Sequence, residues 1–384
     1  MITIDDKSRC SGCTACVNGC PVKCISMKAD SEGFLYPSVD QTLCIGCGRC
    51  LDICPYNSEH VGVPLSAYAV RAGSEPVSSS GGAVAAIASR WVADGGCVYG
   101  AAFDDSLQVC HIKADSQEDL RRLNTSKYVQ SRLDDTFEQI RGLLTQGHRV
   151  LFIGTPCQVA GLKSFVGHNT SLLTVQIACH GVPSPKLWNS YLTAMEKTLG
   201  GRMQSVNFRD KSNNWKCYNV AYRSCAKELK VPFNQDTYML AYLQHLSLRP
   251  SCYECEFRGT SCADVVAGDL WNADVLLPDY FDGKGFTLIA VYTESGQVIL
   301  DKLNNDGDLS YCVPVNYASA VDSNPGFGAS FSHPKQRQEF FSGLYCTEDV
   351  MTYMNAFIYR IPKLKAFHAK IHSILSRIKK KILR

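Results

Sequence analysis

The sequence predicts a protein of the α+β or α/β class in three parts. These are a small cysteine-rich module over residues 1–60, a mixed α/β domain over residues 61–350 and a basic amphipathic helix over residues 351–384. Nine of the 20 cysteines lie within residues 10–54, strand-like and helix-like segments alternate through the middle of the chain, and basic residues alternate with apolar ones at its end. A chain of 384 residues can bury a large apolar core without disulfides, so the cysteines need another explanation.

The composition is that of an ordinary globular protein, with 45% hydrophobic and 20% charged residues. The N-terminus lacks the features of a secretory signal, and no apolar run is long enough for a membrane-spanning helix. We therefore expect a cytoplasmic protein, in which many cysteines indicate metal or redox chemistry. Residues 360–384 hold nine Lys and Arg and no acidic residue, whereas the rest holds 30 basic and 36 acidic residues. This balance argues against a nucleic-acid-binding surface.

Two cysteine runs, 34 residues apart, carry the clearest chemistry. Each run reads Cys-x₂-Cys-x₂-Cys-x₃-Cys-Pro, the pattern of bacterial ferredoxins that binds [4Fe–4S] clusters. In two-cluster ferredoxins the fourth cysteine of each run binds the other cluster. The sequence thus predicts one cluster on Cys10, Cys13, Cys16 and Cys54, and a second on Cys44, Cys47, Cys50 and Cys20.

The residues between these cysteines suit the same interpretation. Small residues such as Gly12, Gly46 and Gly48 let the backbone amides turn toward a cluster, and the proline after each fourth cysteine stops regular structure from continuing. Zinc sites more often use pairs of Cys-x₂-Cys, and disulfides do not suit the compartment. Cys24 falls outside the pattern, and we expect it to be a buried residue beside a cluster.

The middle of the chain alternates between short apolar strands and helices, which predicts a sheet covered by helices. An alanine-rich helix should end at Gly95, and a helix after Thr155 should have Pro156 in its first turn. The order of the strands does not follow from the sequence. The expected strands are 67–71, 98–103, 109–113, 149–154 and 172–178, and the expected helices are 81–94, 135–144, 156–166 and 184–199.

The spacing of a second group of cysteines, in this domain, does not define a single ligand set. Cys252 and Cys255 form a Cys-x₂-Cys pair that needs two further ligands, and Cys157 and Cys179 follow strand ends, where α/β sheets place functional atoms. Cys157 should also lie at a helix N-terminus, which favours the thiolate. A third [4Fe–4S] site, a site in which Cys262 replaces one ligand, and cysteines without metal all remain open. No ligand spacing is visible for Cys97, Cys110, Cys217, Cys225, Cys312 and Cys346.

The turn from Ser78 to Gly82 precedes a helix and suits either a phosphate or a simple helix cap. This turn is one of several motifs in which the chain resembles a known family over about residues 8–330. The family comprises the beta subunits of coenzyme F420-reducing hydrogenase and related dehydrogenases, together with their bacterial relatives. Besides the two cysteine runs, the resemblance rests on Ser80–Ala83, Thr125–Ser131, Leu151–Gly161, Cys179–Ser184, Arg249–Cys255 and Asp264–Trp271.

The resemblance implies an FAD-binding domain with a [4Fe–4S] cluster beside the flavin, held by Cys157, Cys179, Cys252 and Cys255. It implies an oxidoreductase whose flavin exchanges a hydride with a deazaflavin, NAD(P)H or an organic substrate, while the clusters carry single electrons to a redox partner. An electron-transfer subunit that serves a partner enzyme is the alternative. The flavin contacts that it implies are Ser80, Gly81, Gly82, Thr125, Ser126, Lys127, Tyr128, Gln130, Gly154 and Thr155.

The end of the chain, residues 360–384, has apolar residues at steps of three to four, with Lys and Arg on much of the remaining surface. This pattern is typical of a helix that lies on an anionic membrane surface. A helix that packs on the protein's own core or on a partner shows a similar pattern. We expect peripheral contact with the inner face of the cell membrane.

Overall fold

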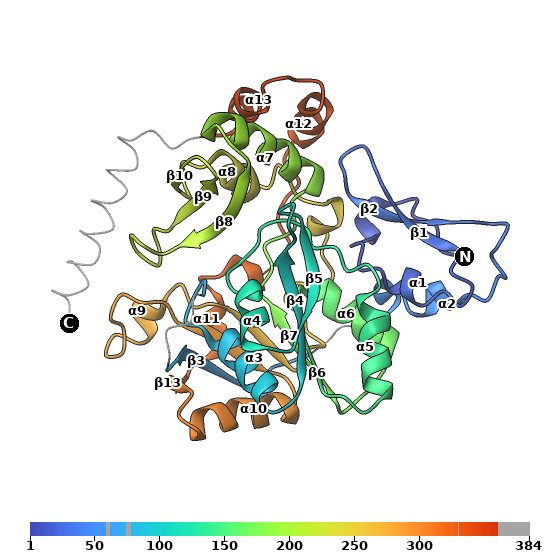
Figure 1. Ribbon diagram of the computed structural model, residues 1–384. Helices are drawn as coiled ribbons and strands as arrows, with labels where there is room; N and C mark the ends of the chain where they lie inside the picture. The colour runs from blue at the N-terminus through green and yellow to red at the C-terminus, as the bar shows by residue number, and fades with distance from the viewer. Residues whose placement is uncertain (59–61, 74–77, 329, 360–384) are drawn as a thin grey trace.

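The structure is a computed structural model that describes residues 1–58, 62–73, 78–328 and 330–359. The predicted membrane-binding segment 360–384 lies outside the described residues. Figure 1 shows the cysteine-rich module at one end of the molecule, beside a large central sheet with a smaller sheet above it. None of the helices in the described ranges is long and apolar enough to span a membrane.

The cysteine-rich module is a β-hairpin with two short helices against it. Strands β1 (Ile25–Ala29) and β2 (Leu35–Val39) pair antiparallel. Helices α1 (Ala15–Asn18) and α2 (Arg49–Asp52) each contain the third cysteine of their run. Single 3-10 turns, η1 (Lys7–Arg9) and η2 (Pro55–Asn57), lie at the two ends of the module.

The central sheet has eight strands in the order β13-β3-β12-β11-β7-β6-β4-β5. The inner neighbours β11, β7, β6 and β4 run parallel, and the strands toward both edges pair antiparallel. The sheet is therefore mixed, as expected for this domain. Its strands are β3 (Ser66–Ala72), β4 (Cys97–Phe103), β5 (Val109–Ala114), β6 (Val150–Gly154), β7 (Leu172–Ile177), β11 (Val265–Asp269), β12 (Thr287–Val291) and β13 (Leu309–Pro314).

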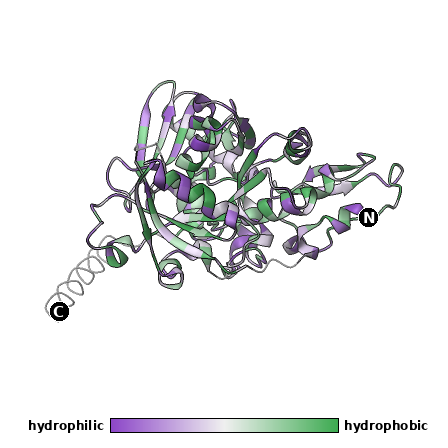
Figure 2. Cartoon of the chain, turned by 90° about the horizontal axis from the view of Figure 1, so that it is seen from below, coloured by the Kyte–Doolittle hydropathy of each residue, from purple (hydrophilic) through white to green (hydrophobic). Residues whose placement is uncertain are grey.

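Helices cover both faces of this sheet. One face packs on α3 (Ala83–Ala93), α4 (Gln117–Leu123) and α10 (Glu294–Asn305), and the other packs on α5 (Thr136–Thr145) and α6 (Pro156–Val166). Figure 2 shows the result as hydrophobic strands enclosed by helices that alternate between hydrophobic and hydrophilic residues. The short elements α9 (Ala273–Leu276), α11 (Tyr317–Val321) and η4 (Pro325–Phe327) pack on strands β3, β11 and β12.

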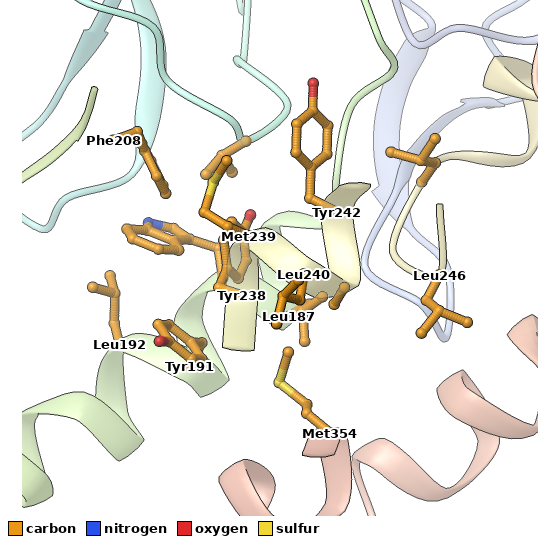
Figure 3. Packing of buried hydrophobic residues seen from close by; sticks show 14 of the residues in the cluster. Leu187, Tyr191, Leu192, Phe208, Tyr238, Met239, Leu240, Tyr242, Leu246 and Met354 are labelled. Carbon is orange, nitrogen blue, oxygen red and sulfur yellow. The ribbon is translucent and has the colours of Figure 1, made fainter. Parts of the chain in front are cut away.

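A second lobe packs its own apolar core beside the sheet. Its antiparallel strands are β8 (Met203–Asp210), β9 (Asn219–Ser224) and β10 (Glu228–Pro232). Figure 3 shows this core, where side chains of α7, β8, α8 and α13 meet, among them Leu187, Phe208, Tyr238 and Met354. The helices are α7 (Pro185–Leu199), α8 (Thr237–Leu243), α12 (Arg337–Leu344) and α13 (Val350–Phe357), and η3 (Pro250–Cys252) follows α8.

All nine predicted strands and helices of the middle region are confirmed to within three residues at each end. Their termini follow the expected chemistry. Gly95 follows α3 in the left-handed conformation with φ of 81°, and Ser184 caps α7 by accepting a hydrogen bond from the Leu187 amide. The small sheet β8–β10 was not predicted, because its strands are separated by polar turns of little apolar periodicity.

Candidate iron–sulfur and cofactor centre

The two cysteine runs fold into the same backbone conformation. Gly12 and its counterpart Gly46 have φ of 70° and 71°, and Thr14 and its counterpart Gly48 have φ of 63° and 74°. These left-handed residues turn successive peptide groups in both loops, a conformation that favours glycine. The 34-residue repeat seen in the sequence is therefore a repeat of local structure.

We call the first thiol set Cys10, Cys13, Cys16 and Cys54. All four cysteines line one pocket, although Cys54 comes from the other run. This exchange of the fourth cysteine is the arrangement predicted from the spacing. Burial raises the pKa of the Cys16 thiol to about 12, and the neighbouring cysteines Cys10 and Cys54 add to that shift.

We call the second thiol set Cys20, Cys44, Cys47 and Cys50. These cysteines line a second pocket, and Cys47 is exposed to solvent. Cys24 lines the same pocket, and its sulfur lies 3.4 Å from that of Cys20. Cys24 is thus a buried neighbour of the set, as expected from its position outside the motif.

We call the third thiol set Cys157, Cys179, Cys252 and Cys255. Cys157 begins α6, Cys179 follows β7, and the other two belong to η3 and the turn after it. The charge of a neighbouring member raises the pKa of one partner in all six pairings, with Cys179 responding to the other three cysteines. Three loops therefore bring four thiols together, and two of these loops follow the carboxyl ends of the parallel strands β6 and β7.

The expectation that Cys157 favours the thiolate because of its helix N-terminus is wrong for the thiol as it stands in this structure. Burial raises the pKa of Cys157, and the nearby thiol of Cys255 raises it further. Hydrogen bonds from Thr155 and Ser11 and the charge of Arg249 oppose that rise without overcoming it. Desolvation outweighs the helix end here.

Cys262 lies beside the third thiol set but does not join it. It contacts the same apolar cluster of Tyr56, Ala160 and Phe257 as Cys157 and Cys255 do. However, the charges that act on its thiol are those of Lys163 and Asp264.

The thiols of the first and second sets each line a pocket. Within the described ranges, no three His, Cys, Asp or Glu side chains are placed around a single metal ion. A mononuclear zinc site needs sulfurs within roughly 2.3 Å of one centre. A [4Fe–4S] cluster is instead held by four thiolates around its outside, so its ligands stand farther apart.

The three sets lie in the order second, first, third. Cys50 of the second set acts on the thiols of Cys16 and Cys54, and Cys157 of the third set acts on that of Cys13. The buried ring of Tyr56 lies within electrostatic reach of Cys10, Cys157 and Cys255, from the first and third sets. The first set is therefore the middle one.

Several of the residues expected to contact a flavin lie in two loops that touch. The Ser126 amide and hydroxyl both bond to the Ser79 hydroxyl, at 2.8 and 2.9 Å. Gly82 precedes α3 with φ of 83°, and the Ser80 hydroxyl donates to the Phe286 carbonyl. A Cβ on Gly81 would lie 2.5 Å from the Val70 carbonyl oxygen, so this position accepts only glycine.

The other expected flavin contacts differ in what they touch. Lys127 is half-buried and donates to the carbonyls of Asn124 and Thr125, and desolvation lowers its pKa to about 7. Thr125 has φ of 65°, which a β-branched residue rarely adopts. Thr155 caps α6 after Gly154 through reciprocal bonds with Gln158, and its hydroxyl lies 3.4 Å from the Cys157 sulfur.

Tyr128 and Gln130 have further contacts outside these loops, and the Tyr128 hydroxyl accepts a hydrogen bond from Arg209 at 3.3 Å. The Tyr128 ring stacks on Tyr242 with centroids 4.9 Å apart. The Gln130 side chain donates to the Ser11 carbonyl at 3.0 Å and accepts from Arg249 at 3.1 Å. The amide nitrogen of Gln130 therefore joins the sheet domain to the first cysteine run, and its oxygen holds Arg249.

Two basic side chains from β8 and the turn after it reach the Ser79–Ser80 loop, and the sequence reasoning missed both. Arg209 donates to the Ser79 carbonyl at 3.0 Å and pairs with Asp269, and Lys211 donates to the Ser80 carbonyl at 3.2 Å. The Nε atom of Arg209 is buried and has no hydrogen-bond partner among the described residues. No sequence signal identifies either residue, because β8 belongs to a sheet that was not predicted.

Comparison with known proteins identifies two families. Residues 9–58 match the 4Fe-4S dicluster domain, and residues 147–315 match the C-terminal region of the coenzyme F420 hydrogenase/dehydrogenase beta subunit. No curated protein sequence matches the chain. A chain of the F420-reducing [NiFe] hydrogenase complex from Methanosarcina barkeri is similar at 15% identity and a TM-score of 0.46, over 71% of this chain and 97% of that one. On these two matches, the chain carries a 4Fe-4S dicluster domain followed by a region that matches the coenzyme F420 hydrogenase/dehydrogenase beta-subunit family.

Proposed function

We propose that this protein is an iron–sulfur flavoprotein oxidoreductase that holds three [4Fe–4S] clusters and one FAD. The observation that carries the proposal is the third thiol set, in which Cys157, Cys179, Cys252 and Cys255 gather beside the first set. Four neighbouring thiols beyond the eight of a dicluster domain suit one further [4Fe–4S] cluster.

The surroundings of the Ser79–Ser80 loop support binding of an anionic cofactor such as FAD. The N-terminus of α3 follows this loop, and helix N-termini attract phosphate groups. Arg209 adds a buried positive charge with a free Nε–H, and Lys211 adds a second charge nearby. Ser80, Gly81, Gly82, Thr125, Ser126, Gly154 and Thr155 are the proposed contacts, with Lys127 close to them.

The order of the thiol sets suggests the route of the electrons. FAD, when bound, supplies the exchange between two-electron and one-electron chemistry. The protein's part is to hold the third cluster beside it, the first cluster in the middle and the second near the surface, where Cys47 is exposed. The two-electron partner would then act at the flavin, and a one-electron partner at the second cluster.

A partner protein follows from the family, which is described as a beta subunit of hydrogenases and dehydrogenases. The same description favours a second candidate function, an electron-transfer subunit that has no substrate of its own and serves a partner enzyme. We also propose that the protein acts in the cytoplasm and touches the inner face of the membrane through residues 360–384. Unchanged binding to anionic vesicles after deletion of that segment would refute the membrane contact.

The test of the proposed function is cofactor analysis of anaerobically purified protein. We expect FAD to be released in a one-to-one ratio with the chain, and Ser126→Ala, which removes the bond to Ser79, to lower that ratio. Protein without flavin, under conditions that keep its iron, would refute the flavoprotein proposal and leave the electron-transfer subunit. Reduction by NAD(P)H, reduced deazaflavin or ferredoxin then separates an enzyme from a relay.

A further inference from the structure

Arg249 is a buried cation without an acidic partner. Its side chain is fully buried, with an exposure of 0%. Its guanidinium donates to the Cys10 carbonyl at 2.7 Å, the Leu35 carbonyl at 2.9 Å and the Gln130 amide oxygen at 3.1 Å. These acceptors are all uncharged, and no Asp or Glu in the part of the chain that the structure describes forms an ion pair with it.

Such a charge is costly, because arginine stays protonated and an unpaired buried ion loses its hydration. Aromatic rings offset little of that cost. The guanidinium carbon lies 4.2 Å from the centroid of the Tyr36 ring and 5.5 Å from that of Phe34. Cation–π contacts of this kind are weaker than an ion pair with a carboxylate in the same surroundings.

The remaining groups around Arg249 are cysteines of two thiol sets. One Nη atom lies 3.7 Å from the Cys10 sulfur of the first set. The charge of Arg249 also lowers the pKa of Cys157 and Cys252 of the third set, against the larger effect of burial. Arg249 therefore lies between the first and third thiol sets. By contrast, the pocket of the second set is lined by no charged side chain.

We propose that Arg249 is the shared counter-ion of the first and third clusters and raises the reduction potentials of both relative to the second. This inference rests on the cluster assignments of the proposed function. A [4Fe–4S] cluster with four thiolates is anionic, and its reduction adds one electron without forming or breaking a bond. A fixed buried cation stabilises the more negative, reduced form, since the low dielectric of the interior screens the attraction weakly.

The two cysteine loops have the same backbone conformation, which makes the second cluster an internal reference for the first. With similar loops and similar ligands, the two sites differ in the charges around them and in their exposure to solvent. Arg249 would hold electrons on the inner pair of clusters, and the second cluster would be the more strongly reducing one at the surface.

The test is a redox titration followed by electron paramagnetic resonance on the full-length, cluster-loaded protein. In Arg249→Gln, which removes the charge, we expect the potentials of the first and third clusters to become more negative while that of the second changes less. Arg249→Lys keeps the charge and should restore most of the shift. Arg49→Gln is the matched control, because Arg49 adjoins Cys50 but is exposed, where solvent screens its charge.

Equal shifts of all three clusters, or no shift, would overturn the proposal. Iron loss in Arg249→Gln but not in Arg249→Lys would support it, whereas equal iron loss in both would contradict it, because lysine keeps the charge. The wild-type titration separates this proposal from the proposed function. Only two clusters in the wild type would refute the third cluster. The effect of Arg249 on the reduction potential of the first cluster would still be measured by comparison with that of the second.

Discussion

Gly161 of helix α6 lies so close to Cys13 that a Cβ on the glycine would be 2.9 Å from the cysteine sulfur. This contact presses the first cysteine run against the helix that begins with Pro156 and Cys157. The absence of a side chain on Gly161 thus sets how closely the first and third thiol sets approach. Electron transfer between neighbouring clusters depends on that approach.

Replacing Gly161 should push the first cysteine run away from helix α6. We expect Gly161→Ala to destabilise the protein by about 1–3 kcal/mol through overpacking. Anaerobic urea unfolding measures the change. Gly142→Ala is the matched control, since Gly142 is a helical glycine with open space around it, and alanine there should stabilise by about 0.5–1 kcal/mol. Equal effects of the two substitutions would show that Gly161 is not a close contact.

The ligand assignment of the third thiol set predicts a defined loss of metal. Cys255→Ser should lower the iron content by about four atoms per chain, which is one cluster, and should leave the dicluster module intact. Cys262→Ser serves as its control, because Cys262 contacts the same apolar cluster but lies outside the set. Iron loss in the Cys262 variant with retention in the Cys255 variant would reverse the assignment.

The buried ion pair between Glu32 and Arg337 joins the hairpin of the cysteine-rich module to helix α12. The Arg337 side chain is 5% exposed and bonds to both carboxylate oxygens of Glu32. Glu32→Gln leaves the arginine charge buried and unpaired, so we expect a loss of about 3 kcal/mol in the free energy of unfolding. Lys7→Gln, which breaks the more exposed pair with Asp30, should cost less than about 1 kcal/mol. If the two variants lost similar free energies of unfolding, burial would not explain the contribution of the Glu32–Arg337 pair.

His111 should make the stability depend on pH. It stacks on Phe152, and Nε2 lies 3.1 Å from the Ile153 carbonyl, so this nitrogen carries the proton and Nδ1 accepts from Ser131. Burial lowers the pKa of His111 from its usual 6.5 to about 4. Between these two values the unfolded chain binds the extra proton, so stability falls as the pH falls below about 6.5.

Between pH 7.5 and pH 6 this contribution amounts to roughly 1 kcal/mol. The free energy of unfolding, measured at both pH values, should fall by that much less in His111→Gln than in the wild type. His148→Gln tests the same substitution at an exposed histidine and should keep the wild-type dependence. If His111→Gln kept the full pH dependence of stability, a group other than His111 would be its source.

The sequence predicted the parts of the site whose chemistry is local. The spacing of Cys10 to Cys20 and of Cys44 to Cys54 reflects the geometry of one loop, and the structure forms the same loop twice. The exchange of Cys20 and Cys54 between the pockets also follows from that pattern. Short apolar strands such as Val150–Gly154 were predictable because burial on both faces leaves a clear apolar run.

The remaining parts depend on contacts between distant segments. Arg249 meets Cys10 across 239 positions of the sequence, and Arg209 meets Ser79 across 130. Nothing in the residues around Arg249 indicates that it is buried without a carboxylate. The sheet order, which brings β11 beside β7, is likewise fixed by tertiary packing. Local patterns do not encode such pairings.

The central claim is that this chain holds three clusters, two in the dicluster module and one at the third thiol set. The most direct measurement is the iron and acid-labile sulfide content of anaerobically purified, full-length protein, combined with the number of reducible clusters by electron paramagnetic resonance. We expect about twelve iron atoms and three reducible clusters per chain. About eight iron atoms and two clusters, in protein whose dicluster module is fully loaded, would contradict the account.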